Sequence, residues 1–333
     1  HHACCDGSGA FALINDLLIA YALEQGDKAG VQANNTAIKP MDVIRLAHRN
    51  RFDLTFGRMV RMVPKLAIGL LGVRQFVMRN PTSLSANPPV PLEQSTPSGY
   101  PRVIAFRLRS DDANRIQKTA RRNNVTPNQL FTSDLFLAID DWRSAIGLVT
   151  DRWIRFSIPI NVRTDKDFSM PAANKVSMVF LDRRGDHFRN PSALLHGIRD
   201  ELQLISRNRL ELMFLISLWL ARRFRGNAAA AAKTDSCQST TLLTNVGSPF
   251  KRSPFLQNAG KLVVSDLVLE KFEVVAPLRA YTDVAFSIGE YAGDYHITMH
   301  WDPRTISSQQ AEALMAAYVK RLRNPNYDET SDG

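Results

Sequence analysis

The first seven residues of the chain combine side chains that can move a proton with side chains that can shape a turn. They read His1-His2-Ala3-Cys4-Cys5-Asp6-Gly7, and a run with helical spacing follows. A neutral histidine near pH 7 can accept a proton from an alcohol or an amine while that atom attacks a thioester carbonyl. The two histidines are therefore candidate general bases, and the remnant of a histidine tag is the alternative interpretation.

Asp6 and Gly7 suit positioning roles in this segment. Asp6 lies four residues after His2, too far along an extended turn for a simple proton relay, so we expect it to pair with an arginine and fix the loop. Gly7 allows the chain to turn tightly into the helix. The backbone N–H groups at that helix start can also stabilise an oxyanion.

The elements that must position this segment alternate between helix and strand, which predicts an α/β (or α+β) fold. Helical spacing and capping residues predict helices at 8–23, 41–78 with a break at Pro64, 110–123, 126–145, 192–225 and 307–322. Ser110, Thr126 and Ser307 are the expected N-caps. Alternating apolar residues predict strands at 103–108, 153–162, 175–181, 240–246, 261–270, 283–290 and 295–301.

Length and composition indicate a globular chain of about two domains. The chain has 333 residues, is 44% hydrophobic and carries a net charge of +10. This composition excludes a disordered or collagen-like chain, and three cysteines without a CxxC pair argue against a disulfide framework or a structural zinc site. Six prolines fall between residues 81 and 101, which predicts a linker there, with domains at 1–80 and 102–333.

The charge of the chain is concentrated in residues 45–79. Eight basic residues and one acid, Asp53, give this stretch a net charge of +7. We expect an anionic partner here, and a solvated face is the alternative. No pattern of stacking aromatic residues accompanies the charge, so nucleic acid is not the expected partner. The apolar run at 212–221 is too short to span a membrane, which leaves a buried helix or, alternatively, an interfacial contact with lipid.

The first seven residues fit the pattern HHxxxDG, and with further segments in the same order they resemble the condensation-domain and CoA-dependent acyltransferase superfamily. Peptide-synthetase condensation domains, wax ester synthases and alcohol acetyltransferases belong to it. The supporting segments are NVTPNQL at 124–130, SIPINVR at 157–163, TNVG at 244–247, and a closing hairpin with a Trp-Asp-Pro turn at 291–303.

The resemblance implies two chloramphenicol-acetyltransferase-like lobes with a tunnel between them. A donor thioester on CoA or on the phosphopantetheine of an acyl carrier protein enters from one side and the acceptor from the other. The resemblance makes His2 the general base and pairs Asp6 with Arg163 as a structural contact. It implies that Cys4 and Cys5 are packing residues rather than part of a nucleophilic Cys–His pair. Arg163 as a solvated strand end is the alternative to that pairing.

Asn245 has two interpretations, either a turn asparagine or a hydrogen-bond donor near the reacting oxygen. The resemblance implies no permanently bound cofactor, no metal and a cytoplasmic protein, with peripheral contact to an anionic membrane as the alternative. Family members carry more than a hundred residues before the motif, so we expect a fragment or a processed chain whose first lobe is incomplete. The expected activity is acyl transfer to a hydroxyl or an amine, and the alternative is a non-catalytic relative that binds an acyl carrier or a lipid.

Overall fold

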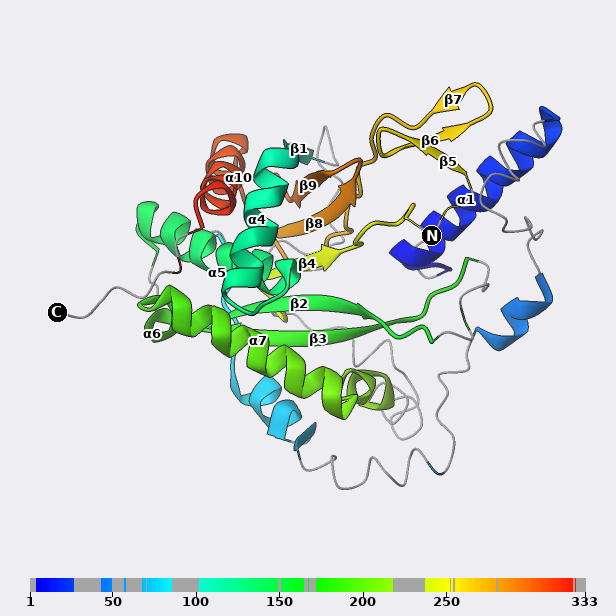
Figure 1. The fold of residues 1–333 in the computed structure, drawn as a ribbon. Helices are drawn as coiled ribbons and strands as arrows, with labels where there is room; N and C mark the ends of the chain where they lie inside the picture. Colours follow the sequence, from blue (N-terminus) through cyan, green and yellow to red (C-terminus); the bar gives the residue numbers. More distant parts are fainter. Residues whose placement is uncertain are drawn as a thin grey trace.

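The computed structural model describes residues 4–26, 43–49, 57, 68–69, 71–85, 102–148, 151–164, 167, 172–217, 237–251, 253, 255–279, 281–325 and 327. Its centre is a six-stranded sheet in the order β1-β9-β8-β4-β2-β3 (Figure 1). The strands are β1 (Arg102–Leu108), β2 (Ile154–Asn161), β3 (Val176–Arg183), β4 (Thr241–Asn245), β8 (Val284–Tyr291) and β9 (Asp294–Trp301). β4 is parallel to β2 and to β8, and the other neighbours are antiparallel. The mixed sheet with its helices confirms the α/β class.

Helices pack against one face of this sheet and form the main core with it. They are α4 (Ser110–Arg122), α5 (Pro127–Ala145), α6 (Gly185–Phe188), α7 (Pro191–Asn208) and α10 (Ser308–Arg323). α5 is buried along most of its length, and its Phe136 ring stacks on Phe156 of β2 at a centroid distance of 3.6 Å. The apolar faces predicted for these segments therefore meet in one core.

The helix starts follow the expected caps with one exception. Thr126 and Ser307 each accept a hydrogen bond from the backbone N–H three residues on, as predicted, and Gln129 and Gln310 complete capping boxes. The prediction for Ser110 was wrong, because Arg109 occupies the N-cap and Ser110 is the first helical residue of α4. Two acids in the first turn of α4 favour that end of the helix dipole without a side-chain cap.

A second, three-stranded sheet forms from β5 (Leu256–Asn258), β6 (Lys261–Val264) and β7 (Leu267–Val268). The prediction of one strand over 261–270 was wrong, because the backbone turns at Ser265, which has a positive φ of 54°. Helix α1 (Gly7–Glu24) lies beside this sheet (Figure 1) and buries Ile19 and Ala22 in a cluster with Leu262 and Val264. The helix predicted at 8–23 is thereby confirmed and placed.

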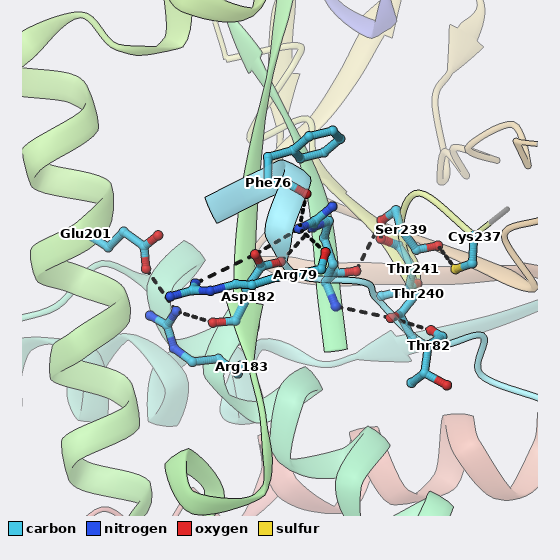
Figure 2. A network of polar contacts seen from close by, with 11 residues as sticks. Phe76, Arg79, Thr82, Asp182, Arg183, Glu201, Cys237, Ser239, Thr240 and Thr241 are labelled. Carbon is cyan, nitrogen blue, oxygen red and sulfur yellow. Dashed lines mark hydrogen bonds and ion pairs between the residues drawn. The ribbon is translucent and has the colours of Figure 1, made fainter. Parts of the chain in front are cut away.

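Of the helix predicted at 41–78, the structure describes two pieces, a 3-10 helix η1 (Val43–His48) and a helix at 71–78. Arg155 of β2 holds the end of the second piece. Its side chain, 1% exposed, bonds Asp182 through Nε and Nη2 at 2.6 and 3.0 Å. Its Nη2 also donates to the carbonyls of Phe76 and Arg79 at 3.1 and 3.0 Å. Figure 2 shows Phe76, Arg79 and Asp182 in this network, which fastens the helix to the sheet.

The first residues of the predicted linker are packed against the second half of the chain. Leu84 is fully buried, and its N–H and that of Ser85 donate to Asp283 at 2.8 and 3.0 Å. Residues 86–101 lie outside the described residues. The division of the chain at 80 and 102 stays a prediction.

The long helix predicted at 192–225 is interrupted. α7 ends at Asn208, and Arg209 takes a left-handed conformation with φ of 57°. Helical backbone resumes at 211–217, and 218–225 lie outside the described residues. Of the apolar run at 212–221, Leu212 is buried, which agrees with a packed helix at its start.

Candidate active site

Asp6 is the anchor of the N-terminal motif. It is the N-cap of α1 and is 5% exposed. Its Oδ1 accepts the N–H of Gly9 at 2.8 Å, and its Oδ2 accepts the N–H of Lys175 at 2.7 Å and Nη1 of Arg163 at 2.8 Å. Three donors from three parts of the chain therefore satisfy one buried carboxylate.

Arg163 reaches Asp6 from the end of β2 and is itself held in place. Its Nη2 donates to the carbonyl of Ala173 at 2.7 Å, and the side chain is 15% exposed. Asn161 accepts the Arg163 backbone N–H at 3.0 Å and donates to Ser8 Oγ at 3.4 Å. The structure thus brings Asp6 and Arg163 together as the resemblance pairs them, and it does not leave Arg163 as a solvated strand end.

A buried ion pair supports the backbone just before β3, where the Lys175 N–H donates to Asp6. Lys175 is fully buried, and its Nζ lies 2.6 Å from Asp167 Oδ1. The N–H of Thr164 donates to the other carboxylate oxygen at 2.9 Å. Burial by itself raises the pKa of Asp167, but the bonds from Lys175 and Thr164 outweigh it and lower the pKa below its ordinary value. Asp167 therefore stays ionised at neutral pH, and its contact with Lys175 fixes the backbone around residue 175.

The glycine that the geometry requires is Gly9 rather than Gly7. Gly7 is the first helical residue of α1, so the expected tight turn at this position was wrong. A Cβ on Gly9 would lie 2.5 Å from the Ala173 carbonyl oxygen and 2.9 Å from its nitrogen. Because both contacts are to backbone, α1 can approach the backbone at Ala173 only without a side chain at position 9. Since the Gly9 N–H donates to Asp6, that donor is also taken and does not face an oxyanion.

Gly9→Ala is expected to lower the free energy of unfolding by about 1–3 kcal/mol, because overpacking against fixed backbone forces α1 outward. Gly197→Ala in α7 is the matched control, since a Cβ there meets nothing within 4 Å. Chemical denaturation of both variants measures the difference. Equal stability of the two variants would contradict the close approach.

Asn245 ends β4 beside the start of α1. A Cβ on Gly7 would lie 3.4 Å from Val246 Cγ1, which places the two segments in contact. Asn245 Oδ1 accepts the N–H of Gly247 at 2.8 Å, and Gly247 has φ of +63°. Its Nδ2 donates to Asn128 Oδ1, in the first turn of α5, at 3.3 Å. The turn interpretation of Asn245 matches this geometry.

The catalytic candidates His1 and His2 lie outside the described residues. Cys4, two positions after His2, is exposed, and Cys5 is half-buried. His296 and His300 are buried on β9, and burial lowers the pKa of His296. No three His, Cys, Asp or Glu side chains gather into a metal site in the part of the chain that the structure describes.

Three contributors to the site escaped the sequence analysis: the Ala173 carbonyl, the Lys175 N–H and the Asn128 amide. Two of them are backbone atoms, which any residue type supplies, so no side-chain pattern identifies them. Asn128 follows the capping residue of α5 and belongs to the segment NVTPNQL, so its position was indicated but its contact with Asn245 was not.

No family model matches the chain, and no curated protein matches its sequence. Solved structures do match. The epimerization domain from the third module of tyrocidine synthetase B superposes with a TM-score of 0.60 at 14% identity, covering 97% of this chain and 66% of that chain. The first condensation domain of the calcium-dependent antibiotic synthetase, in complex with a substrate analogue, gives 0.61 at 15% identity, covering 98% and 63%.

The condensation domain from the monacolin K polyketide synthase gives a TM-score of 0.58 at 16% identity, covering 96% of this chain and 66% of that one. The chain therefore has the condensation-domain fold, and the predicted chloramphenicol-acetyltransferase-like class is confirmed. It spans about two thirds of the length of these structures or slightly less. The incomplete first lobe stays a prediction.

None of the helices in the described ranges is long and apolar enough to cross a membrane.

Proposed function

We propose that the protein transfers an acyl group from a pantetheine thioester, on CoA or on an acyl carrier protein, to a hydroxyl or an amine. The observation that carries the proposal is the anchored Asp6 carboxylate, bound by Arg163, Gly9 and Lys175. With all its close partners structural, Asp6 holds the backbone and moves no proton. The motif histidines precede Asp6 in the same short segment of the chain. The condensation-domain fold of the chain supports placing them beside this anchor.

In the proposed reaction, His2 removes the proton from the acceptor while the acceptor oxygen or nitrogen attacks the thioester carbonyl. The tetrahedral intermediate then collapses, the carbon–sulfur bond breaks, and the pantetheine sulfur leaves and takes up a proton. Asp6 and Arg163 keep the His2 segment in place. Asn245 would contact substrate only if its bond to Asn128 opens, so we assign it to shaping the turn at the end of β4.

The donor would approach as an anion, which suits the basic stretch at 45–79. Of its cations, Arg49 and Arg74 are exposed, whereas Arg79 lies 3.7 Å from Asp182 and is not free. Arg51, Arg58, Arg61 and Lys65 lie outside the described residues. We propose that the exposed members of this stretch meet the donor's carrier protein or the CoA phosphates. Peripheral contact with an anionic membrane is the alternative partner, and a cytoplasmic location belongs to the same proposal.

His2→Ala tests the proposal. Loss of a general base is expected to lower the turnover number about 10²–10⁴-fold with little change in binding of the thioester. The measurement follows release of the pantetheine thiol with an acyl-CoA and an acyl carrier as donors and an alcohol and an amine as acceptors. His196→Ala, at a half-buried position of α7, is the control and should keep full turnover.

Two outcomes would reject this assignment. If His2→Ala turns over at the control rate, His2 is not the base. If the unmodified protein binds a carrier-bound acyl group but releases no thiol with any acceptor, the non-catalytic alternative is correct.

A further inference from the structure

A cavity of about 950 Å³ lies between β3, α7, residues 68–69 and 71–79, and the helical segment at 211–217. Its volume falls at the upper end of the range typical of small-molecule sites, about 300–1,000 Å³. Figure 1 shows α7 running alongside β3, with the helix at 71–78 below them. The α7 residues that line the cavity run from Ala193 to Ile205, which corresponds to about 18 Å of helix. The lining therefore extends along most of the length of α7.

The two ends of the cavity differ in polarity. At one end, Arg79 lies 3.7 Å from Asp182, and Arg183 lies 2.9 Å from Glu201. Figure 2 shows these four side chains close together. Their charges are paired within the protein, so this end offers polar contacts without a strong net field.

The opposite end is apolar. A Cβ built on Gly69 would lie 3.0 Å from the Met213 side chain, so these two segments meet there. The rings of Phe180 and Phe214 pack edge to face with centroids 5.9 Å apart. On α7, Leu204 and Ile205 line this end of the cavity. The cavity is therefore polarised from end to end, as an amphipathic single-chain molecule is.

Three apolar side chains that line the cavity are exposed in the part of the chain that the structure describes. Leu71 is 56% exposed, Leu204 is 46% exposed and Ile68 is 37% exposed. An aliphatic chain bound in the cavity would remove this apolar surface from water, which is favourable.

We propose that this cavity binds one long aliphatic chain, with the polar head of the ligand beside Arg79, Asp182 and Arg183. The chain belongs either to a free fatty acid or to an acyl thioester. The cavity lies along β3 and α7, apart from the Asp6 anchor, and the proposal does not depend on the proposed function.

Two glycines allow the cavity to be filled without disturbing the backbone. A Cβ on Gly72 or on Gly197 meets no atom within 4 Å, and both residues line the cavity. Gly197→Leu and Gly72→Leu would project a side chain into the ligand space. Gly197→Ala is the matched control, because it adds only one methyl group at the same site. Far-UV circular dichroism and thermal unfolding check that all three variants fold.

The probe is cis-parinaric acid, a fluorescent fatty acid, titrated into the protein. Saturable binding is expected in the unmodified protein and in Gly197→Ala, with at least a tenfold loss of affinity in both leucine variants. In competition, each added methylene from decanoate to palmitate should tighten binding, by up to about fourfold per group until the cavity is filled. Displacement by palmitate identifies a free lipid ligand, and displacement by palmitoyl-CoA alone identifies the acyl chain of a thioester.

The proposal is overturned if the unmodified protein shows no saturable binding. It is equally overturned if the folded leucine variants bind the probe as tightly as Gly197→Ala does. Neither outcome bears on His2, because the turnover assay is separate.

Discussion

Replacing Asp6 by asparagine is expected to lower the free energy of unfolding by about 3–5 kcal/mol, since it leaves the half-buried Arg163 guanidinium without its counter-charge. The asparagine amide would also point a donor at the Lys175 N–H or at Arg163, which both donate to Asp6. Asparagine can still cap α1 through its Oδ1, so the change acts on the contacts with Arg163 and Lys175 that hold the segment carrying the histidines. Denaturant titration measures the stability, and the thiol-release assay measures the accompanying loss of turnover.

A double-mutant cycle with Arg163→Ala isolates the pair. The double variant should lose less stability than the sum of the single losses, because removing both partners leaves no unpaired charge. Asp141→Asn is the control: Asp141 is 58% exposed and pairs with Arg321 at the surface, so its loss should cost about 0–1 kcal/mol. Strictly additive losses at Asp6 and Arg163 would show that the contact carries no coupling energy.

The second large effect is a pH dependence from Asp134. This carboxyl lies inside α5 and is 2% exposed, and burial raises its pKa to about 7 although the Tyr327 hydroxyl donates to it at 2.6 Å. In the unfolded chain the group titrates near 3.9. Between about pH 4 and pH 7 the folded state therefore keeps a proton that the unfolded state has lost. The free energy of unfolding falls as pH rises through this window, by about 4 kcal/mol in total.

Asp134→Asn removes this dependence. The stability of the variant relative to the unmodified protein should rise by about 4 kcal/mol between pH 4 and pH 8, with no further change above pH 8. Tyr327→Phe is the informative companion, because removing the donor moves the window to higher pH. A constant difference between Asp134→Asn and the unmodified protein at every pH would mean that Asp134 titrates normally.

The sequence was most informative where one residue type has one physical role. Thr126-Pro127 and Ser307 begin helices because hydroxyl caps and proline suit the first turn, and the alternation in β2 and β9 specifies strands. The prediction of one continuous strand or helix failed where a single residue turns the backbone inside the predicted segment. Ser265 and Arg209 both take a left-handed backbone conformation, which neither serine nor arginine predicts.

At the site, the pairing of Asp6 with Arg163 followed from a resemblance over short motifs, and charge complementarity makes it reasonable. The close packing of Gly9 on Ala173 could not be foreseen, because it depends on where a distant strand passes. The same holds for the Lys175 N–H, which any residue at that position would supply. Sequence patterns therefore predicted the charged side chains that pair, whereas the backbone contacts could be identified only from the folded structure.

The anchor at Asp6 has a consequence for the order of events during synthesis. The segment that Asp6 belongs to leaves the ribosome before Arg163, Lys175 and Val246, its partners in the folded chain. At about 5–20 residues per second, translation from Asp6 to Val246 takes roughly 10–50 s. During that interval α1 has neither its cap partners nor the β5–β7 sheet that covers Ile19 and Ala22. A nascent chain therefore exposes the apolar side of α1 well before its site is complete, which makes this helix a region where a holdase chaperone would engage.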